Sequence, residues 1–287
     1  MRRLSAAILP LLVCALAFTG SAVAGSGDPE VAALQVGLRE RGLYSGTVDG
    51  VLGSATQASL RRFQRRAGLP ADGVPGPKTR AALGRYGLRA PLGRRDLVLG
   101  MRGWDVTALQ FALAWHGFPS GNFDGRFGAR TLAALRRFQA WAGLKQDGRA
   151  RASTLAALRA PPPRSPIKLA PPVEAPTGDA YGPRGARFHS GLDFVADAGA
   201  PVAAPAAGQV VFAGLHGGGW GKLVVVSHGH GVRTLHAHLS RIDVRVGQQV
   251  SAASRLGLVG ATGNSSGPHL HFEVLVRGAA VDPATAF

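Results

Sequence analysis

The sequence predicts a multidomain protein in which two small all-α three-helix modules are followed by an all-β antiparallel domain. In the N-terminal half, one stretch recurs without gaps at an offset of 75 residues, and its apolar residues have helical spacing. The C-terminal half instead consists of short runs of β-branched residues punctuated by glycine, with no long helical pattern between them. A proline-rich segment lies between the two halves.

The repeat is clearest in two segments. Val31-Ala-Ala-Leu-Gln35 recurs as Val106-Thr-Ala-Leu-Gln110, and Leu60-Arg-Arg-Phe-Gln64 recurs as Leu135-Arg-Arg-Phe-Gln139. Each copy is expected to hold three helices in about 60 residues, which supports only a modest core. Domain boundaries follow from these patterns: 28–87 and 97–160 for the two modules, 161–176 for the linker and 177–287 for the β domain.

Local signals refine the helices. Val31, Leu34 and Leu38 form the apolar stripe of the first helix. Ser54 and Gln57 have the spacing of a capping box, which would start the second helix. In the linker, seven prolines disfavour both helix and central strand, so an extended, semi-rigid spacer that separates the two halves is expected.

The N-terminus resembles a secretory signal. A basic start is followed by an apolar run and by Ala-x-Ala spacing up to Ala24, so residues 1–24 are expected to be removed. The apolar run is shorter than the roughly 20 residues that a membrane-spanning helix needs. Cys14 is the only cysteine and would leave with this segment. Any metal in the mature chain must then be held by histidine and carboxylate.

Positive charge is concentrated in the modules. Residues 25–160 contain 21 Lys/Arg against 9 Asp/Glu, a net charge of +12, whereas 177–287 contain 8 against 6, a net charge of +2. Such a surface favours polyanions, and for a secreted protein these are anionic wall polymers and lipid head groups more than nucleic acid. Arginine-rich codon usage is the alternative explanation.

Histidines cluster in the β domain. The strands expected there are 208–213, 222–227, 233–238, 256–259 and 269–274. His189 and Asp193 lie four residues apart, while His236 with His238 and His269 with His271 have the spacing of same-face pairs on strands. A catalytic zinc site needs three protein ligands and an open position. His189, Asp193 and one of the last pair supply them, and spacing alone allows either histidine.

The two repeats resemble the peptidoglycan-binding module of cell-wall hydrolases. The shared features are the Leu-Gln of the first helix, the Phe-Gln of the second and a glycine-rich loop that ends in Asp-Gly. In that loop, Asp49 and Asp124 have two interpretations, a ligand contact or an Asp-Gly turn, and the turn is favoured.

The C-terminal half resembles the lysostaphin-type (LytM-type) zinc endopeptidases. The resemblance rests on His189-x-Gly-x-Asp193, on His238-Leu239 and on Gly267-Pro-His-Leu-His-Phe-Glu273. It implies that His189, Asp193 and His271 bind Zn²⁺, and that His238 and His269 act on the water and the developing oxyanion.

Several further residues carry paired interpretations. His236 replaces an aromatic residue of the family and either packs or competes for metal, with packing favoured. Glu273 either holds a histidine ring or is an ordinary edge-strand glutamate, and Trp220 either lines the groove or packs in its loop. Arg184 is assigned a structural or substrate-orienting role. The remaining histidines of this half are expected to be solvent-exposed turn residues: His216, His228 and His230.

Together these features predict a secreted, extracellular or wall-associated zinc metalloendopeptidase that hydrolyses cross-bridge or stem peptides of bacterial peptidoglycan. The expected partners are peptidoglycan and anionic wall polymers, with no nucleic acid, no stable membrane anchor and a monomeric state. One alternative is a catalytically inactive relative that binds the wall and activates an amidase. The other is a basic wall-adhesion protein.

Overall fold

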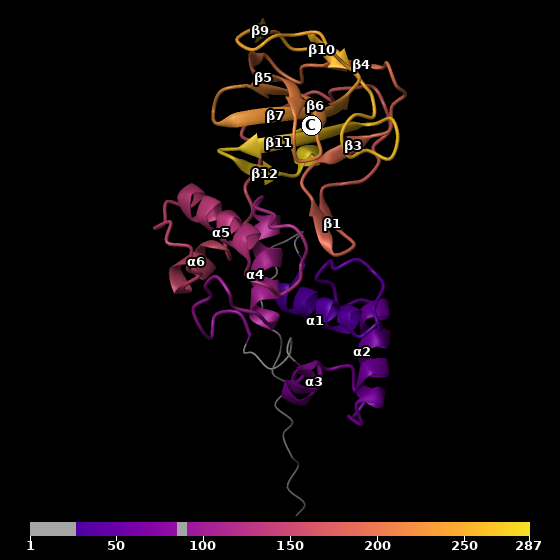
Figure 1. Ribbon diagram of the computed structural model, residues 1–287, viewed down its shortest axis with the longest axis vertical. Coiled ribbons are helices and arrows are strands. Elements are labelled where there is room, and N and C mark those ends of the chain that lie inside the picture. Colours follow the sequence, from indigo (N-terminus) through magenta and orange to yellow (C-terminus); the bar gives the residue numbers. More distant parts are fainter. Residues whose placement is uncertain (1–26, 85–90) are drawn as a thin grey trace, which may run out of the picture.

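The computed structural model describes residues 27–84 and 91–287, in which a helical N-terminal part is followed by a β domain (Figure 1). The predicted signal segment, residues 1–24, and the last residues of the first module, 85–87, lie outside the described residues. Among the described helices, none is both long and apolar enough to cross a membrane. The fold class predicted from the sequence is confirmed.

Each repeat contains three helices, and the offset between the copies is kept at every helix boundary. The first copy contains α1 (Pro29–Glu40), α2 (Ser54–Arg66) and α3 (Pro77–Ala82), and the second contains α4 (Trp104–Trp115), α5 (Ala129–Trp141) and α6 (Ala152–Ala157). All boundaries of the second set are 75 residues beyond those of the first. The repeat in the sequence is therefore a repeat of structure.

The start of α2 differs from the prediction. Gly53 occupies the N-cap with an extended backbone and, having no side chain, makes no side-chain cap bond. Ser54 is the first helical residue, and the Gln57 side chain donates to the carbonyl of Leu52 at 3.2 Å. The predicted capping box is wrong because the glycine takes the one position from which a serine hydroxyl could cap.

A buried glutamine network organises each helix–turn–helix segment and occurs twice within each copy. In one example, the side-chain nitrogen of Gln110 donates to Asp124 Oδ1 at 2.9 Å, and its oxygen accepts from the backbone of Gly125 at 3.0 Å. Asp124 also accepts from Arg126 N at 2.9 Å, which closes the Asp-Gly turn. The glutamines in equivalent positions are Gln35, Gln64 and Gln139. Asp49 and Asp124 thus both fill the turn role.

The two copies pack against each other through α1 and α4 (Figure 1). Trp104 is fully buried, and its indole N–H donates to Glu30 Oε2 at 2.5 Å, while the other oxygen of Glu30 accepts from Leu92 N at 2.9 Å. Burial raises the pKa of Glu30. A carboxylate of the first copy thus satisfies groups of the second.

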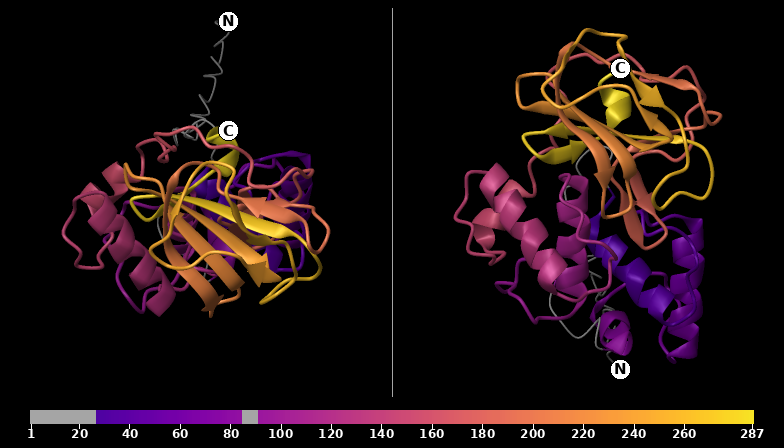
Figure 2. Two further views of the ribbon diagram at one scale, coloured as in Figure 1. Left: turned by 90° about the horizontal axis from the view of Figure 1, so that it is seen from above. Right: turned by 45° about the horizontal axis from the view of Figure 1, so that its top comes forward.

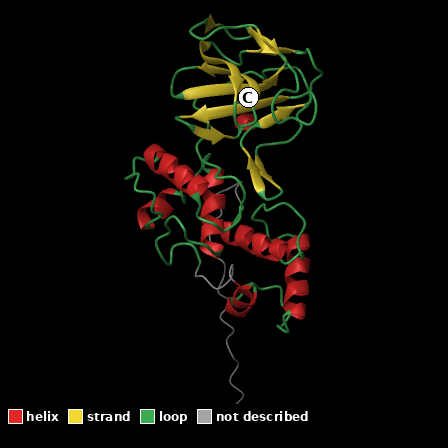
Figure 3. Ribbon diagram, in the orientation of Figure 1, coloured by secondary structure: helices red, strands yellow, loops and turns green. Residues whose placement is uncertain are grey.

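The C-terminal half is built from short antiparallel strands (Figure 3). They are β1 (Gly182–Arg184), β2 (Arg187–His189), β3 (Leu192–Phe194), β4 (Pro201–Ala203), β5 (Gly208–His216), β6 (Gly221–Ser227), β7 (Val232–Leu239), β8 (Arg241–Ile242), β9 (Gln249–Val250), β10 (Arg255–Leu258), β11 (Leu270–Val276) and β12 (Ala279–Val281). A single 3₁₀ turn, Pro283–Thr285, follows in the described chain.

These strands form three sheets. The main sheet has the order β12-β11-β7-β6-β5-β9, and β3 also pairs with β11; a second sheet has the order β4-β10-β8, and β1 and β2 form a hairpin of their own. Phe272, Val224 and Val226 are fully buried on one face of the main sheet. Its opposite face carries a smaller apolar cluster around Leu223, Leu235 and Ala237, beside the polar residues His271 and Glu273.

The second half of the predicted semi-rigid spacer does not stand apart from the β domain. Leu169 and Val173 are 5% and 6% exposed and belong to the core of the β domain. Leu169 N donates to the carbonyl of Ala286 at 2.8 Å, and Ala203 N donates to that of Pro172 at 2.8 Å. The second half of the segment folds onto the β domain because its few apolar side chains can be buried there, even though its prolines exclude regular structure.

Candidate active site

An open cleft of about 640 Å³ lies over the part of the main sheet that carries His271 and Glu273. The β1–β2 hairpin, β3, β11 and the loops before β6 and β11 surround it. Among the residues that line it are all five predicted site residues: His189, Asp193, His238, His269 and His271. The structure therefore brings together residues that are spread over more than 80 positions of the sequence.

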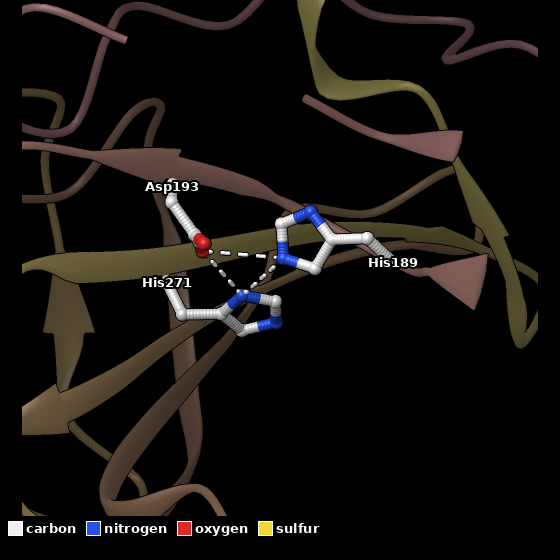
Figure 4. Close-up of side chains that lie close together, drawn as sticks. All are labelled: His189, Asp193 and His271. Carbon is white, nitrogen blue, oxygen red and sulfur yellow. Dashed lines mark hydrogen bonds and ion pairs between the residues drawn. The ribbon is translucent and has the colours of Figure 1, made fainter. Parts of the chain in front are cut away.

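Three of these side chains point at one another (Figure 4). His189 Nε2 lies 3.1 Å from His271 Nδ1 and 3.2 Å from Asp193 Oδ1, and His271 Nδ1 lies 2.8 Å from the same carboxylate oxygen. The strand register explains the approach, because Asp193 on β3 pairs directly with His271 on β11. His189, the last residue of the β1–β2 hairpin, approaches this pair from outside the main sheet.

Hydrogen bonds on the side away from Asp193, here called the outer side, orient the rings of His189 and His271. His189 Nδ1 lies 2.9 Å from the carbonyl oxygen of Ala180, and His271 Nε2 lies 3.0 Å from Glu273 Oε1. Oxygens of these kinds accept hydrogen bonds, so each neutral ring carries its proton on the outer nitrogen. The inner nitrogens, His189 Nε2 and His271 Nδ1, then present lone pairs to the space beside Asp193.

These three donors fit a zinc ion. In a tetrahedral site with Zn–N bonds of about 2.0–2.1 Å, the donors are about 3.3 Å apart, close to the separations found here. Two imidazoles and one carboxylate leave a fourth position toward the cleft, as catalytic zinc requires. Carbonyl and carboxylate partners behind the rings, such as Ala180 and Glu273, are typical of metal-binding histidines.

Burial and the short contacts among these three side chains shift the pKa values of Asp193 and His271. Burial would raise the pKa of Asp193, but hydrogen bonds from His189 and His271 lower it well below its ordinary value. Burial would lower the pKa of His271, yet its hydrogen bonds to Asp193 and Glu273 raise it to about 9. With this pKa, His271 is protonated on both nitrogens at neutral pH, and a metal ion bound beside Asp193 would displace the Nδ1 proton and leave the neutral ring with its proton on Nε2.

His238 reaches the cleft through a β-bulge. Lys222 pairs with Leu239 but Val224 pairs with His236, so β7 contains one extra residue. His238 has a left-handed backbone with φ 63°, and its side chain turns toward His269, with ring centroids 4.7 Å apart. The prediction that His236 and His238 share a face is wrong, since a bulge breaks the alternation of a strand.

His238 and His269 are held in the same way. His238 Nδ1 lies 2.7 Å from the carbonyl oxygen of Thr262, and His269 Nδ1 lies 2.9 Å from that of Gly267. Each Nδ1 therefore carries the proton, and each Nε2 keeps a lone pair. Burial lowers the pKa of His238, which favours its neutral form. His269 precedes β11 and forms an isolated bridge with Gly260.

His236 lies on the opposite face of the sheet, in the core. It is fully buried, its ring is 5.3 Å from that of Phe272, and its Nδ1 is 3.4 Å from the carbonyl oxygen of Val224. Its Nε2 has no partner, and burial lowers its pKa to about 3. In this position it packs in the core and faces away from His189, Asp193 and His271.

The other histidines follow the prediction only in part. His216 and His230 are exposed. His228 is half-buried, with Nε2 2.8 Å from Thr234 Oγ1 and Nδ1 2.9 Å from the carbonyl oxygen of Ala207. The prediction of a solvent-exposed turn residue is wrong for His228, because these two groups hold its ring against the sheet.

Residues around the ligands complete the site. Glu273 is on a central strand, 4% exposed, and also accepts from Ser190 Oγ at 2.6 Å, so the edge-strand interpretation does not hold. Arg184 donates to Asp179 at 2.7 Å and lies 3.7 Å from the second oxygen of Asp193. Trp220 lines the cleft and packs edge-on to the exposed ring of His216 at 5.0 Å.

Several supporting groups were not found from the sequence, among them Ser190 and the backbone carbonyl groups behind the rings. Ser190 stands inside the His-x-Gly-x-Asp motif, and this position could have been a signal. The carbonyl groups of Ala180 and Thr262 left no such signal, because any residue offers a carbonyl. Backbone partners of this kind are visible only once the fold is known.

The fold and the donor set define a metallohydrolase-type centre on an antiparallel β domain, and sequence comparisons agree with this class. Residues 187–283 match Peptidase family M23, and residues 27–83 and 102–158 match the family Putative peptidoglycan binding domain. The chain thus contains a C-terminal domain that belongs to peptidase family M23, preceded by two peptidoglycan-binding repeats.

Curated relatives share the C-terminal part. DD-carboxypeptidase/endopeptidase Mpg of Neisseria meningitidis is 43% identical over 99 residues, which are 34% of this chain and 23% of the relative. Peptidoglycan DD-endopeptidase ShyA of Vibrio cholerae is 44% identical over 98 residues, 34% of this chain and 23% of the relative. Lysostaphin of Staphylococcus staphylolyticus is 40% identical over 91 residues, which are 31% of this chain and 19% of the relative. The chain spans less than a quarter of these relatives.

Proposed function

We propose that this protein is a secreted zinc metalloendopeptidase that hydrolyses peptide bonds in the cross-bridges or stem peptides of bacterial peptidoglycan. The observation that carries the proposal is the convergence of His189, Asp193 and His271, whose outer hydrogen bonds leave three donor atoms facing one another in an open cleft. The M23 match and the names of the relatives support the substrate class.

In this proposal, the two histidines and Asp193 hold the zinc ion. When bound there, zinc would polarise the scissile carbonyl and lower the pKa of a coordinated water from 15.7 to near 7. Glu273 and the carbonyl of Ala180 keep the lone pairs of the two rings directed inward. Ser190, which donates to Glu273, keeps that carboxylate in place.

His238 and His269 handle the proton and the developing negative charge. The carbonyl groups of Thr262 and Gly267 hold the Nδ1 proton of each ring, so that Nε2 keeps a lone pair that can take a proton. One ring takes the proton of the attacking water and gives it to the leaving amine as the C–N bond breaks; the other, protonated on Nε2 from solvent, donates to the oxyanion of the tetrahedral intermediate. Because the mature chain has no cysteine, no thiol nucleophile takes part.

The repeats would hold the enzyme on its substrate. Their match to a peptidoglycan-binding family supports peptidoglycan as the partner. Secretion rests on the predicted signal in residues 1–24, and a mature protein that begins at Gly25 is the expected product in N-terminal sequencing. The inactive alternative is not favoured, since every expected ligand and catalytic position is filled and brought into one cleft.

Purified walls of defined cross-link chemistry test this function. We expect the zinc-loaded chain to release new amino termini, identified by mass spectrometry of the fragments, and His238→Ala to lose this activity. His271→Ala should lose both activity and zinc. His269→Ala should lose activity but keep zinc close to one equivalent. No release by the zinc-loaded parent would refute the function, and loss of zinc from His269→Ala would refute the division of roles.

A further inference from the structure

The β1–β2 hairpin stands apart from the rest of the β domain. It pairs with neither of the other two sheets, and Figure 1 shows it extending from the β domain toward α1 and α4. His189 is its last residue and pairs with Gly182. A two-stranded hairpin is marginally stable on its own. Contacts outside the β domain must therefore help to hold this metal ligand.

The two repeats hold the tip of the hairpin at equivalent positions. Val48 N donates to the carbonyl of Gly185 at 2.8 Å, and Phe123 N donates to that of Ala186 at 2.9 Å. Val48 and Phe123 are 75 residues apart, so they are the same position in the two copies. Next to the tip, Arg187 Nε donates to Asn122 Oδ1 at 2.8 Å. The tip thus lies across the junction of the repeats.

Aromatic side chains fix the hairpin along its length. Trp115, the last residue of α4, packs edge-on against Phe188 with centroids 5.3 Å apart, and against Tyr181 at 6.2 Å. Tyr181 and Phe188 also contact each other at 4.9 Å. The Tyr181 hydroxyl donates to the carbonyl of Ala280 at 3.1 Å, which ties this cluster to the edge of the main sheet.

From these contacts we infer that the two repeats position a zinc ligand, in addition to any role in wall binding, and that Trp115 is the main positioning residue. Phe188, which Trp115 contacts, is the chain neighbour of His189, and Tyr181 follows Ala180, the residue whose carbonyl orients the His189 ring. A docked hairpin presents His189 already ordered, whereas a released hairpin must be ordered when the metal binds. This inference rests on the proposed zinc site and assigns it a dependence on the N-terminal half.

The test compares zinc affinity among full-length variants by competition with a chromophoric chelator. Trp115→Ala should weaken zinc binding by about tenfold, the lower end of the range seen when groups behind a metal ligand are lost. Trp115→Phe, which keeps a ring against Phe188, should restore most of the affinity. Trp115→Leu preserves much of the volume without the ring contacts; it should also bind weakly, and it decides the question if the alanine variant does not fold.

Trp141→Ala is the matched control. Trp141 packs in the same repeat, against Phe118 and Phe138, and its ring also lies 5.1 Å from the Arg277 guanidinium at the β11–β12 turn, but none of these ring contacts is with the hairpin. It should lower the stability of the repeat and leave zinc affinity unchanged. Zinc binding by Trp115→Ala or Trp115→Leu as tight as that of the parent would overturn the positioning role alone. A parent that binds no zinc would instead overturn the function on which the role rests.

Discussion

At the scale of single residues, backbone conformation decides which histidines reach the cleft. His238 adopts φ 63°, a left-handed conformation that is uncommon for residues other than glycine, asparagine and aspartate. Without the extra residue in β7, its side chain would join His236 on the core face. This strained conformation places the ring of His238 against both His269 and His271.

His236 should make the stability of the β domain depend on pH. Its pKa is about 3 in the folded state, below the ordinary 6.5, because burial disfavours its charged form. Between these values the unfolded state binds a proton that the folded state does not, so stability is lost as pH falls below 6.5. The loss is about 1.4 kcal/mol for each pH unit.

His236→Phe tests this dependence. A phenyl ring can keep the contact with Phe272, removes the unpartnered Nε2 and does not titrate. The free energy of unfolding, measured in urea at pH 7 and pH 5, should fall by about 2 kcal/mol less in the variant than in the parent. His230→Asn, which changes an exposed histidine, should behave like the parent. Equal losses in all three proteins would show that folding does not lower the pKa of His236.

At the scale of elements, the glutamine networks do more for the repeats than their small cores suggest. The side chain of Gln110 is 1% exposed and joins the turn at Asp124 to Thr131 on α5. Removing it leaves the buried N–H of Gly125 without its partner. An unsatisfied buried group costs about 1–3 kcal/mol.

Gln110→Leu should therefore destabilise the second repeat by about 2 kcal/mol or more, although leucine adds apolar surface. Thermal unfolding followed by circular dichroism measures the change. Gln57→Leu is the control. Gln57 is partly exposed, and its side chain donates a hydrogen bond to the carbonyl of Leu52. This substitution should change the stability little. A Gln110 variant as stable as the parent would mean that water replaces the network.

Helices and strands could be predicted where the residue pattern of the segment itself specifies them. Features that depend on pairing with another segment were missed. The helix pattern and the offset between copies follow from apolar spacing, and β5, β6, β7 and β11 from β-branched runs. The bulge at His238 could not be predicted, because its cause is the pairing of β7 with β6. The roles of His269 and His271 likewise rested on resemblance, because alternation alone puts both on one side.

At the scale of the whole molecule, the two halves touch where the sequence suggested a spacer between them. The hairpin lies against the repeats, and Ala280 N on β12 donates to the carbonyl of Gly117 at 3.1 Å (Figure 2). Contacts between backbone groups so distant in the chain leave no pattern in composition or periodicity. The repeats and the cleft of the β domain are therefore coupled by geometry, while positive charge is concentrated in the repeats.

That uneven charge predicts different salt responses for binding and for hydrolysis. The repeats carry most of the net positive charge, and four arginines on α2 are exposed: Arg61, Arg62, Arg65 and Arg66. Screening shortens from about 30 Å at 0.01 M salt to about 8 Å at 0.15 M. Pull-down on walls that carry anionic polymers should weaken by about tenfold or more over this range. Hydrolysis of an uncharged soluble peptide should change little.

Replacing these four arginines with glutamine tests whether their charge contributes to wall binding without altering the fold of the repeat. The side chains are solvent-exposed, so helix α2 should form as before, while wall affinity at low salt should fall toward its high-salt value. Walls stripped of their anionic polymers provide the matched control, because on them the parent and the variant should bind equally. If salt leaves the binding of the parent to intact walls unchanged, the arginines reflect composition alone, and the repeats recognise peptidoglycan through uncharged contacts.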